Sequence, residues 1–196
     1  MIEFINQIDI QLFLFLNSFH NPFMDKLMWI ISSKYVWIPM YLYFIYLLYK
    51  NYHIESMFIF LAVIVAVALA DSLSVALFKD VFKRFRPSHN PEIAHIVHIV
   101  NNYRGGSYGF ISSHASNVFA LAVILNSFLK SNYRFFPYVI FFWAVLVSYS
   151  RIYLGVHYPG DILGGAIFGS LIALCVIMIF KYIKNKRLSN KSGKIV

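Results

Sequence analysis

Residues 56–78 read SMFIFLAVIVAVALADSLSVALF, and Asp71 is the only charged side chain among them. A helix needs about 20 mostly apolar residues to cross the hydrocarbon core of a bilayer. The segment has that length and composition, so it predicts a membrane-spanning helix. Further apolar segments on both sides of it extend this prediction to most of the chain.

Four more segments are expected to span the membrane, at residues 35–49, 113–129, 135–150 and 162–182. Residues 1–33 differ because polar side chains interrupt their apolar positions, so they predict either an interfacial amphipathic helix or a weak sixth span. We therefore expect an all-α, polytopic membrane helix bundle. Its parts are an N-terminal segment 1–33, a membrane domain 34–183 and a basic cytoplasmic tail 184–196.

Composition places the chain in the membrane class as well. Of its 196 residues, 60% are hydrophobic and 13% are charged, whereas a soluble domain carries about 25% charged residues. The mean hydropathy is +0.66. A net charge of +9 in so apolar a chain favours phosphorylated lipids or anionic headgroups as partners, and not nucleic acid.

The distribution of Lys and Arg predicts the orientation in the membrane. With the C-terminal tail in the cytoplasm, nine of the 17 Lys and Arg residues lie inside, namely Lys50, Lys130, Arg134 and the six from Lys181 to Lys194. Counting helices from there puts the residues around 79, 114, 151 and 157 at the opposite face. We expect a bacterial inner membrane protein with this face toward the periplasm or exterior.

Polar residues of a particular kind gather at four helix ends on that external face. They are Lys79, Lys83, Arg84, Arg86 and Pro87; Ser112, Ser113 and His114; Ser150 and Arg151; and His157, Tyr158, Pro159, Gly160 and Asp161. Cations at a membrane surface often only contact lipid headgroups. That reading does not explain why two histidines and an aspartate lie on the same face.

Phosphoryl chemistry does explain this combination. Positioned Lys and Arg side chains stabilise the negative charge of a phosphoryl group in transfer, and a helix N-terminus adds free N–H donors. A neutral histidine can attack phosphorus when a carboxylate holds its other nitrogen. His157 and Asp161 are four residues apart, which is the spacing of one helical turn. His114 is a candidate acid for the leaving group.

The motifs Lys79-x6-Arg86-Pro87, Ser112-Ser113-His114 and Ser150-Arg151-x5-His157-x3-Asp161 closely resemble the signature of the type 2 phosphatidic acid phosphatase superfamily. The order matches, and so does the spacing within the first and third motifs. One departure lies in the second motif, where the family usually has Pro-Ser-Gly-His and this chain has Ile111-Ser112-Ser113-His114. The resemblance covers residues from about 56 to 182.

The resemblance implies a metal-independent membrane enzyme, without cofactor, that works through a phosphohistidine. It puts the nucleophile at His157, its orienting acid at Asp161 and the leaving-group acid at His114. The phosphate-binding positions are Lys79, Arg86, Ser112, Ser113 and Arg151.

The implied substrate is a phosphorylated membrane lipid, and a polyprenyl diphosphate such as undecaprenyl diphosphate is the first choice. If residues 79–86 are helical, Lys79, Lys83 and Arg86 share one face, and the added cation Lys83 could bind a second phosphate. Lys83 could equally contact lipid headgroups. The alternatives are a phosphatidylglycerol phosphate or lipid A phosphatase, or a lipid phosphotransferase using the same histidine pair.

Three further features have a structural and a functional interpretation. His89, His95 and His98 could form a metal site, but without Cys or paired carboxylates we expect solvated loop histidines. Asp71 inside a span is expected to form an interhelical hydrogen bond. Gly165 and Gly169, four residues apart, are expected to let the last helix approach a neighbour closely.

Overall fold

The computed structural model describes residues 2–192, and helices are its regular secondary structure. The helices are α1 (Ile2–Asn17), α2 (Pro22–Ser32), α3 (Ile38–Tyr52), α4 (Glu55–Ser74), α5 (Asp80–Phe82), α6 (Ser113–Leu129), α7 (Phe136–Tyr153) and α8 (Pro159–Ser192). A π-helical turn, η2 (Val75–Lys79), joins α4 to α5, and the 3-10 turns are η1 (Lys34–Trp37), η3 (Pro87–His89) and η4 (Val100–Asn102). The all-α prediction is confirmed.

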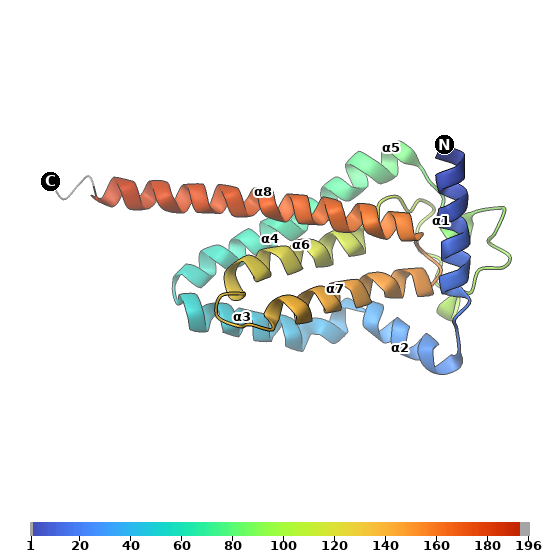
Figure 1. The fold of residues 1–196 in the computed structure, drawn as a ribbon, viewed down its shortest axis with the longest axis horizontal. Helices are drawn as coiled ribbons and strands as arrows, with labels where there is room; N and C mark the ends of the chain where they lie inside the picture. The colour runs from blue at the N-terminus through green and yellow to red at the C-terminus, as the bar shows by residue number, and fades with distance from the viewer. Residues whose placement is uncertain (1, 193–196) are drawn as a thin grey trace.

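Helix α6 lies at the centre of the bundle, against α4, α7 and α8. The long helices run roughly parallel to the long axis of the molecule, and α1 lies across one end of them, against α7 and α8 (Figure 1). Buried apolar side chains from α3, α4, α6, α7 and α8 form the main core. Helix α8 continues past the other end and includes most of the basic tail; residues 193–196 of that tail, like Met1, lie outside the described residues.

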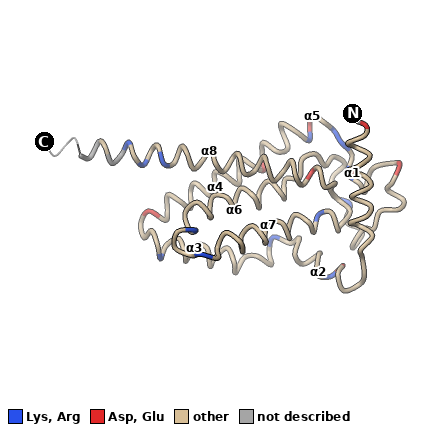
Figure 2. Tube along the Cα trace, in the orientation of Figure 1, with Lys and Arg blue, Asp and Glu red and all other residues tan. Residues whose placement is uncertain are grey.

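Three helical segments are long and apolar enough to cross a membrane, namely Glu55–Phe82, Phe136–Tyr153 and Pro159–Lys186. Helix α6 is apolar but shorter, and α3 is shorter still. Large apolar side chains such as Leu61, Phe142 and Ile179 are exposed on the outer faces. Lys, Arg, Asp and Glu gather mainly toward the two ends of the bundle (Figure 2). The prediction of a membrane helix bundle is therefore confirmed. Of the five spans that the sequence predicts, three are identified by length and composition among the described helices.

Close packing of α6 on α8 depends on glycine. A Cβ atom at Gly165 would lie 2.5 Å from the carbonyl oxygen of Ser112, and one at Gly169 would overlap the backbone of Ser116. Both contacts would be closer than non-bonded carbon and oxygen atoms tolerate. The close approach of the last helix to a neighbour, predicted from these two glycines, is therefore confirmed. This contact brings the first turn of α6 next to the first turn of α8, where the Ser112 N–H donates to the Asp161 carbonyl at 3.0 Å.

Replacing Gly169 by alanine should force α6 and α8 apart and destabilise the bundle, by about 1–3 kcal/mol for such overpacking. We expect a lower unfolding temperature for Gly169→Ala in detergent, measured by a thermal unfolding assay. Gly106→Ala is the matched control, because a Cβ at Gly106 meets nothing within 4 Å. Equal unfolding temperatures for the two variants would contradict this account of the helix contact.

Candidate active site

Four helix ends meet at the end of the bundle that α1 crosses. Lys79 ends η2, Ser113 begins α6, Arg151 lies in the last turn of α7, and Asp161 lies in the first turn of α8. Local sequence explains two of these ends. Ser112 is the N-cap of α6, and its hydroxyl accepts the Ala115 N–H at 3.4 Å, while Pro159 occupies the first position of α8, where its missing N–H costs nothing.

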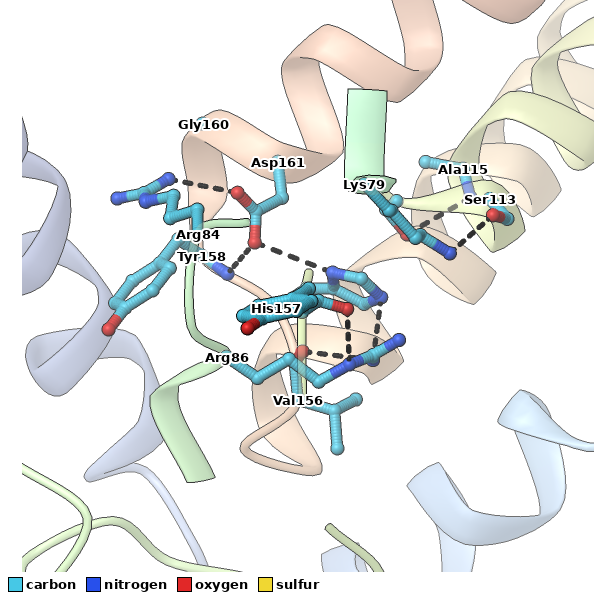
Figure 3. A network of polar contacts seen from close by, with 12 residues as sticks. Lys79, Arg84, Arg86, Ser113, Ala115, Val156, His157, Tyr158, Gly160 and Asp161 are labelled. Carbon is cyan, nitrogen blue, oxygen red and sulfur yellow. Dashed lines mark hydrogen bonds and ion pairs between the residues drawn. The ribbon is translucent and has the colours of Figure 1, made fainter. Parts of the chain in front are cut away.

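His157 lies just before α8 and is 1% exposed. Its Nδ1 is 3.4 Å from Asp161 Oδ2, and its Nε2 is 3.0 Å from Arg86 Nη1 (Figure 3). A guanidinium can only donate, so Nε2 carries the lone pair and the neutral ring has its proton on Nδ1, toward the carboxylate. The spacing of four residues therefore brings the histidine and the aspartate together as the sequence predicts.

Burial and nearby positive charge both favour the neutral form of His157. Burial has the largest effect, and the charges of Arg86 and Arg151 add to it, so the pKa of His157 lies well below its usual value of 6.5. A neutral imidazole is the form that can attack phosphorus.

The predicted phosphate-binding cations are close to this histidine and have neutral hydrogen-bond partners. Arg86, which is buried, donates from Nε to the Tyr108 carbonyl at 3.1 Å and from Nη1 to the Val156 carbonyl at 3.2 Å. Lys79 donates to Ser113 Oγ at 2.6 Å. The serine that replaces the family's usual glycine is thus a direct partner of the lysine.

Arg151 is buried and reaches toward the N-terminal part of the chain. Its Nη1 donates to Ser32 Oγ at 2.6 Å, and its Nη2 donates to Tyr103 Oη at 3.2 Å. Its Nε is buried without a hydrogen-bond partner in the described part of the chain. Ser32, at the end of α2, and Tyr103, in the loop before α6, are site residues that the sequence motifs do not indicate.

Residues 79–86 do not form one continuous helix, so the condition on which Lys83 could join Lys79 and Arg86 is not met. Helix α5 ends at Phe82, and Lys83 takes a left-handed conformation with φ +46°. Lys83 is exposed, whereas Arg86 turns inward to His157, so the two do not share a helical face with Lys79. Lys83 therefore gives no support for binding the second phosphate of a diphosphate lipid.

Arg84, which the sequence places among the basic residues of this segment without a role, has specific partners in the site. Its Nη1 donates to Asp161 Oδ1 at 2.8 Å, and its Nη2 donates to Asp9 Oδ2 of α1 at 2.7 Å. A buried carboxylate at position 161 needs a partner of opposite charge. A nearby cation could therefore have been predicted from the sequence. The sequence did not say which of four neighbouring basic residues would supply it.

A cavity of about 810 Å³ reaches the site between the helices. Apolar side chains of α3, α4, α6 and α7, such as Leu48, Val63 and Trp143, make up most of its lining. His114 faces this cavity and is exposed in it. Asn117 Nδ2 donates to Asp71 Oδ1 at 2.8 Å in the same lining, which confirms the interhelical hydrogen bond predicted for Asp71.

The loop histidines are not simply solvated. His98 Nε2 lies 2.8 Å from Asp25 Oδ1, and its ring stacks on His20 with centroids 3.8 Å apart. His89 contacts Ser88 Oγ at 3.1 Å. The expectation of solvent-facing loop histidines is therefore wrong for His98, because α2 and the segment before it pack against this loop.

Comparison with known proteins identifies relatives over most of the chain. The sequence profile of the PAP2 superfamily matches residues 56–185. Lipid A 4'-phosphatase of Bacteroides thetaiotaomicron is 45% identical over 175 residues, covering 86% of this chain and 75% of that protein. Lipid A 4'-phosphatase of Porphyromonas gingivalis is 38% identical over 187 residues, covering 95% and 78%.

A solved structure resembles the fold. It is that of a transmembrane PAP2 type phosphatidylglycerolphosphate phosphatase from Bacillus subtilis, with a TM-score of 0.67 at 22% identity. The superposition covers 91% of this chain and 87% of that one. At this level of identity the likeness shows the transmembrane fold.

A lowered pKa means that the His157 imidazole stays neutral as the pH falls through 6.5 and is protonated only at lower pH. In protein labelled with ¹⁵N-histidine, we expect the nitrogen shifts of the His157 imidazole to stay unchanged between pH 8 and about 6, below the ordinary histidine pKa. The His157→Asn variant assigns this signal by its loss. A signal that titrates near pH 6.5 would contradict the electrostatic description of the site.

Proposed function

The chain belongs to the PAP2 superfamily, as an integral membrane hydrolase of lipid phosphate, and we propose that it removes a phosphate monoester from a lipid A-type lipid through a phosphohistidine at His157. The observation that carries this proposal is the charge of the site. In the described part of the chain, Lys79, Arg86 and Arg151 donate their hydrogen bonds to neutral groups. Their positive charge is therefore available to an anionic substrate.

The reaction takes two steps. His157 Nε2 attacks phosphorus, the N–P bond forms as the P–O bond to the lipid breaks, and His114 protonates the departing alkoxide. Water then attacks phosphorus, His114 accepts its proton, the N–P bond breaks and inorganic phosphate leaves. Asp161 holds the Nδ1–H throughout.

The cations perform the charge stabilisation in both steps. Arg86 Nη1 contacts His157 Nε2 at 3.0 Å, and it moves to a phosphate oxygen as Nε2 attacks. Lys79 and Arg151 bind further phosphate oxygens, and Ser112 and Ser113 line the N-terminus of α6, where backbone N–H groups point toward an anion. Three cations around one phosphate supply the stabilisation that a metal ion gives in other phosphatases.

Two observations favour a lipid A-type monophosphate over the polyprenyl diphosphate that the sequence motifs rank first. Lys83, on which the diphosphate ranking rested, is exposed beyond the end of α5. The two relatives compared above carry the name lipid A 4'-phosphatase. The cavity of about 810 Å³ that ends at His114 supports a substrate whose hydrocarbon chain lies between the helices while its phosphate reaches His157.

We also propose that α3, α4, α6, α7 and α8 are the five crossings and that α1 lies on the membrane surface. Support comes from α1 lying across the bundle end (Figure 1). With the basic end of α8 in the cytoplasm, the active site opens on the periplasmic or external side. The membrane is then a bacterial inner membrane.

Replacing His157 by alanine should lower phosphate release from a lipid monophosphate by about 10³-fold or more, because the covalent path is lost. His114→Ala should lower it by about 10²-fold on a lipid ester, whose alkoxide needs a proton, and much less on an aryl phosphate with a good leaving group. Phosphate release in excess chelator measures both rates.

Near-normal turnover in His157→Ala would refute the nucleophile assignment, and equal losses on both substrate types in His114→Ala would refute the acid role. Adding an acceptor lipid with free hydroxyl groups separates hydrolysis from phosphotransfer, because a phosphotransferase would form a new phospholipid.

Substrate class can be tested on a panel of lipid A, phosphatidylglycerol phosphate and undecaprenyl diphosphate. We expect the highest kcat/KM on lipid A, and we expect Lys83→Ala to change kcat/KM by less than about threefold on each lipid, because an exposed charge contributes little. Arg86→Ala is the positive control for a lost phosphate contact. A loss confined to the diphosphate in Lys83→Ala, or a clear preference for that lipid, would restore the diphosphate ranking.

A further inference from the structure

We propose that Asp9 of α1 is a positioning residue of the active site, which acts through Arg84 and the first turn of α8 on Asp161. This inference rests on the proposed function, in which Asp161 orients the nucleophile His157. Asp9 lies outside residues 56–185, which match the family profile. The N-terminal helix α1 would then contribute a residue that positions the catalytic groups.

A chain of three short contacts joins Asp9 to the reacting histidine. Asp9 Oδ2 accepts from Arg84 Nη2 at 2.7 Å, and Arg84 Nη1 donates to Asp161 Oδ1 at 2.8 Å. Asp161 Oδ2 faces His157 Nδ1 at 3.4 Å and accepts the Tyr158 N–H at 3.0 Å. Figure 3 shows Arg84 and His157 approaching the Asp161 carboxylate from different sides.

The guanidinium transmits position because it is planar. Its two terminal nitrogens stand in a rigid fork, so fixing Nη2 on Asp9 also fixes the direction from which Nη1 meets Asp161. Arg84 lies with its guanidinium carbon 4.1 Å from the ring centroid of Tyr158, which restricts it further. Nη2 also donates to Asn6 Oδ1 of α1 at 2.9 Å. Without Asp9, Arg84 keeps its charge and this contact to a neutral amide but loses the shorter, charge-assisted contact that orients it.

Asp9 also contacts the first turn of α8 directly. Its Oδ1 accepts the Gly160 N–H at 2.7 Å. Gly160 is the second residue of α8, and N–H groups there have no partner within the helix. A carboxylate at this position also interacts favourably with the helix dipole. Asp9 therefore caps α8 from another helix and fixes the turn that carries Asp161.

Local packing shows that this contact is built into the fold. A Cβ at Gly160 would lie 2.7 Å from Asp9 Oδ2, so the carboxylate occupies space that only glycine leaves open. One turn further along α1, the fully buried Phe13 packs edge-to-face on Tyr158, with centroids 5.4 Å apart. The Asp9 side chain is 13% exposed and that of Asp161 is not exposed. Water therefore has little room to replace a carboxylate oxygen removed from Asp9.

Asp9→Asn should lower kcat by a factor of about ten, equal to about 1.4 kcal/mol of barrier, with KM within about twofold because the phosphate-binding cations remain. The matched control is Glu3→Gln, which removes one negative charge from the exposed start of the same helix and should leave kcat unchanged. Rates are measured on a lipid monophosphate and divided by the amount of folded protein found by size exclusion and thermal unfolding.

A double-mutant cycle distinguishes positioning from a merely structural role. If Asp9 acts through Asp161, then Asp9→Asn causes no further loss of kcat in an Asp161→Asn background. Arg84→Lys, which keeps the charge but not the fork, should resemble Asp9→Asn. A normal kcat in Asp9→Asn, or a tenfold loss that persists undiminished in the Asp161→Asn background, would overturn the proposal.

Failure of this inference is distinguishable from failure of the proposed function. If wild type is active, His157→Ala is inactive and Asp9→Asn is normal, only the role of Asp9 is wrong. If His157→Ala retains activity, the proposed mechanism fails and the positioning role fails with it.

Discussion

Asp161 is a carboxylate with no exposed surface at the start of a membrane-spanning helix, and the rest of the site is arranged around its charge. An ionised group in such a place is costly unless hydrogen bonds and an opposite charge surround it. Arg84 supplies the charge, the Tyr158 N–H supplies a backbone hydrogen bond, and His157 takes the remaining direction. Arg84 binds Oδ1, while the Tyr158 N–H and His157 share Oδ2, and this arrangement sets the orientation of the histidine.

The other cations of the site are treated differently. Arg84 is paired with two carboxylates, whereas Arg86, Arg151 and Lys79 are held by carbonyl, hydroxyl and imidazole groups. This division separates two roles within one basic cluster. Arg84 neutralises the Asp161 carboxylate. The other three cations keep an unbalanced positive charge beside a neutral histidine, which suits an anionic ligand.

Helix packing makes this division possible. The glycines of α8 let α6 approach until the Ser112 N–H reaches the Asp161 carbonyl at 3.0 Å, so the start of α6 and Asp161 are held together. On the opposite side of α6 the helices separate and leave the cavity that ends at His114. His114 therefore lies between tightly packed helices on one side and the cavity on the other.

The sequence by itself determined the membrane class, the helical architecture, and the pairing of His157 with Asp161, because apolar run length and a four-residue spacing are local properties of the chain. Its resemblance to the superfamily also implied Lys79 and Arg86 as phosphate-binding positions, which stays a prediction. Only the tertiary structure decided that Arg84, and not Lys83, faces Asp161, since this depends on α5 ending at Phe82 and the chain turning there. Ser32 lies 119 residues before Arg151 in the sequence and contacts it directly. Asp9 lies 152 residues before Asp161 and is linked to it through Arg84. No local pattern marks such residues, because in sequence they are ordinary polar positions in an N-terminal segment, and their partners are chosen by where α1 and α2 pack.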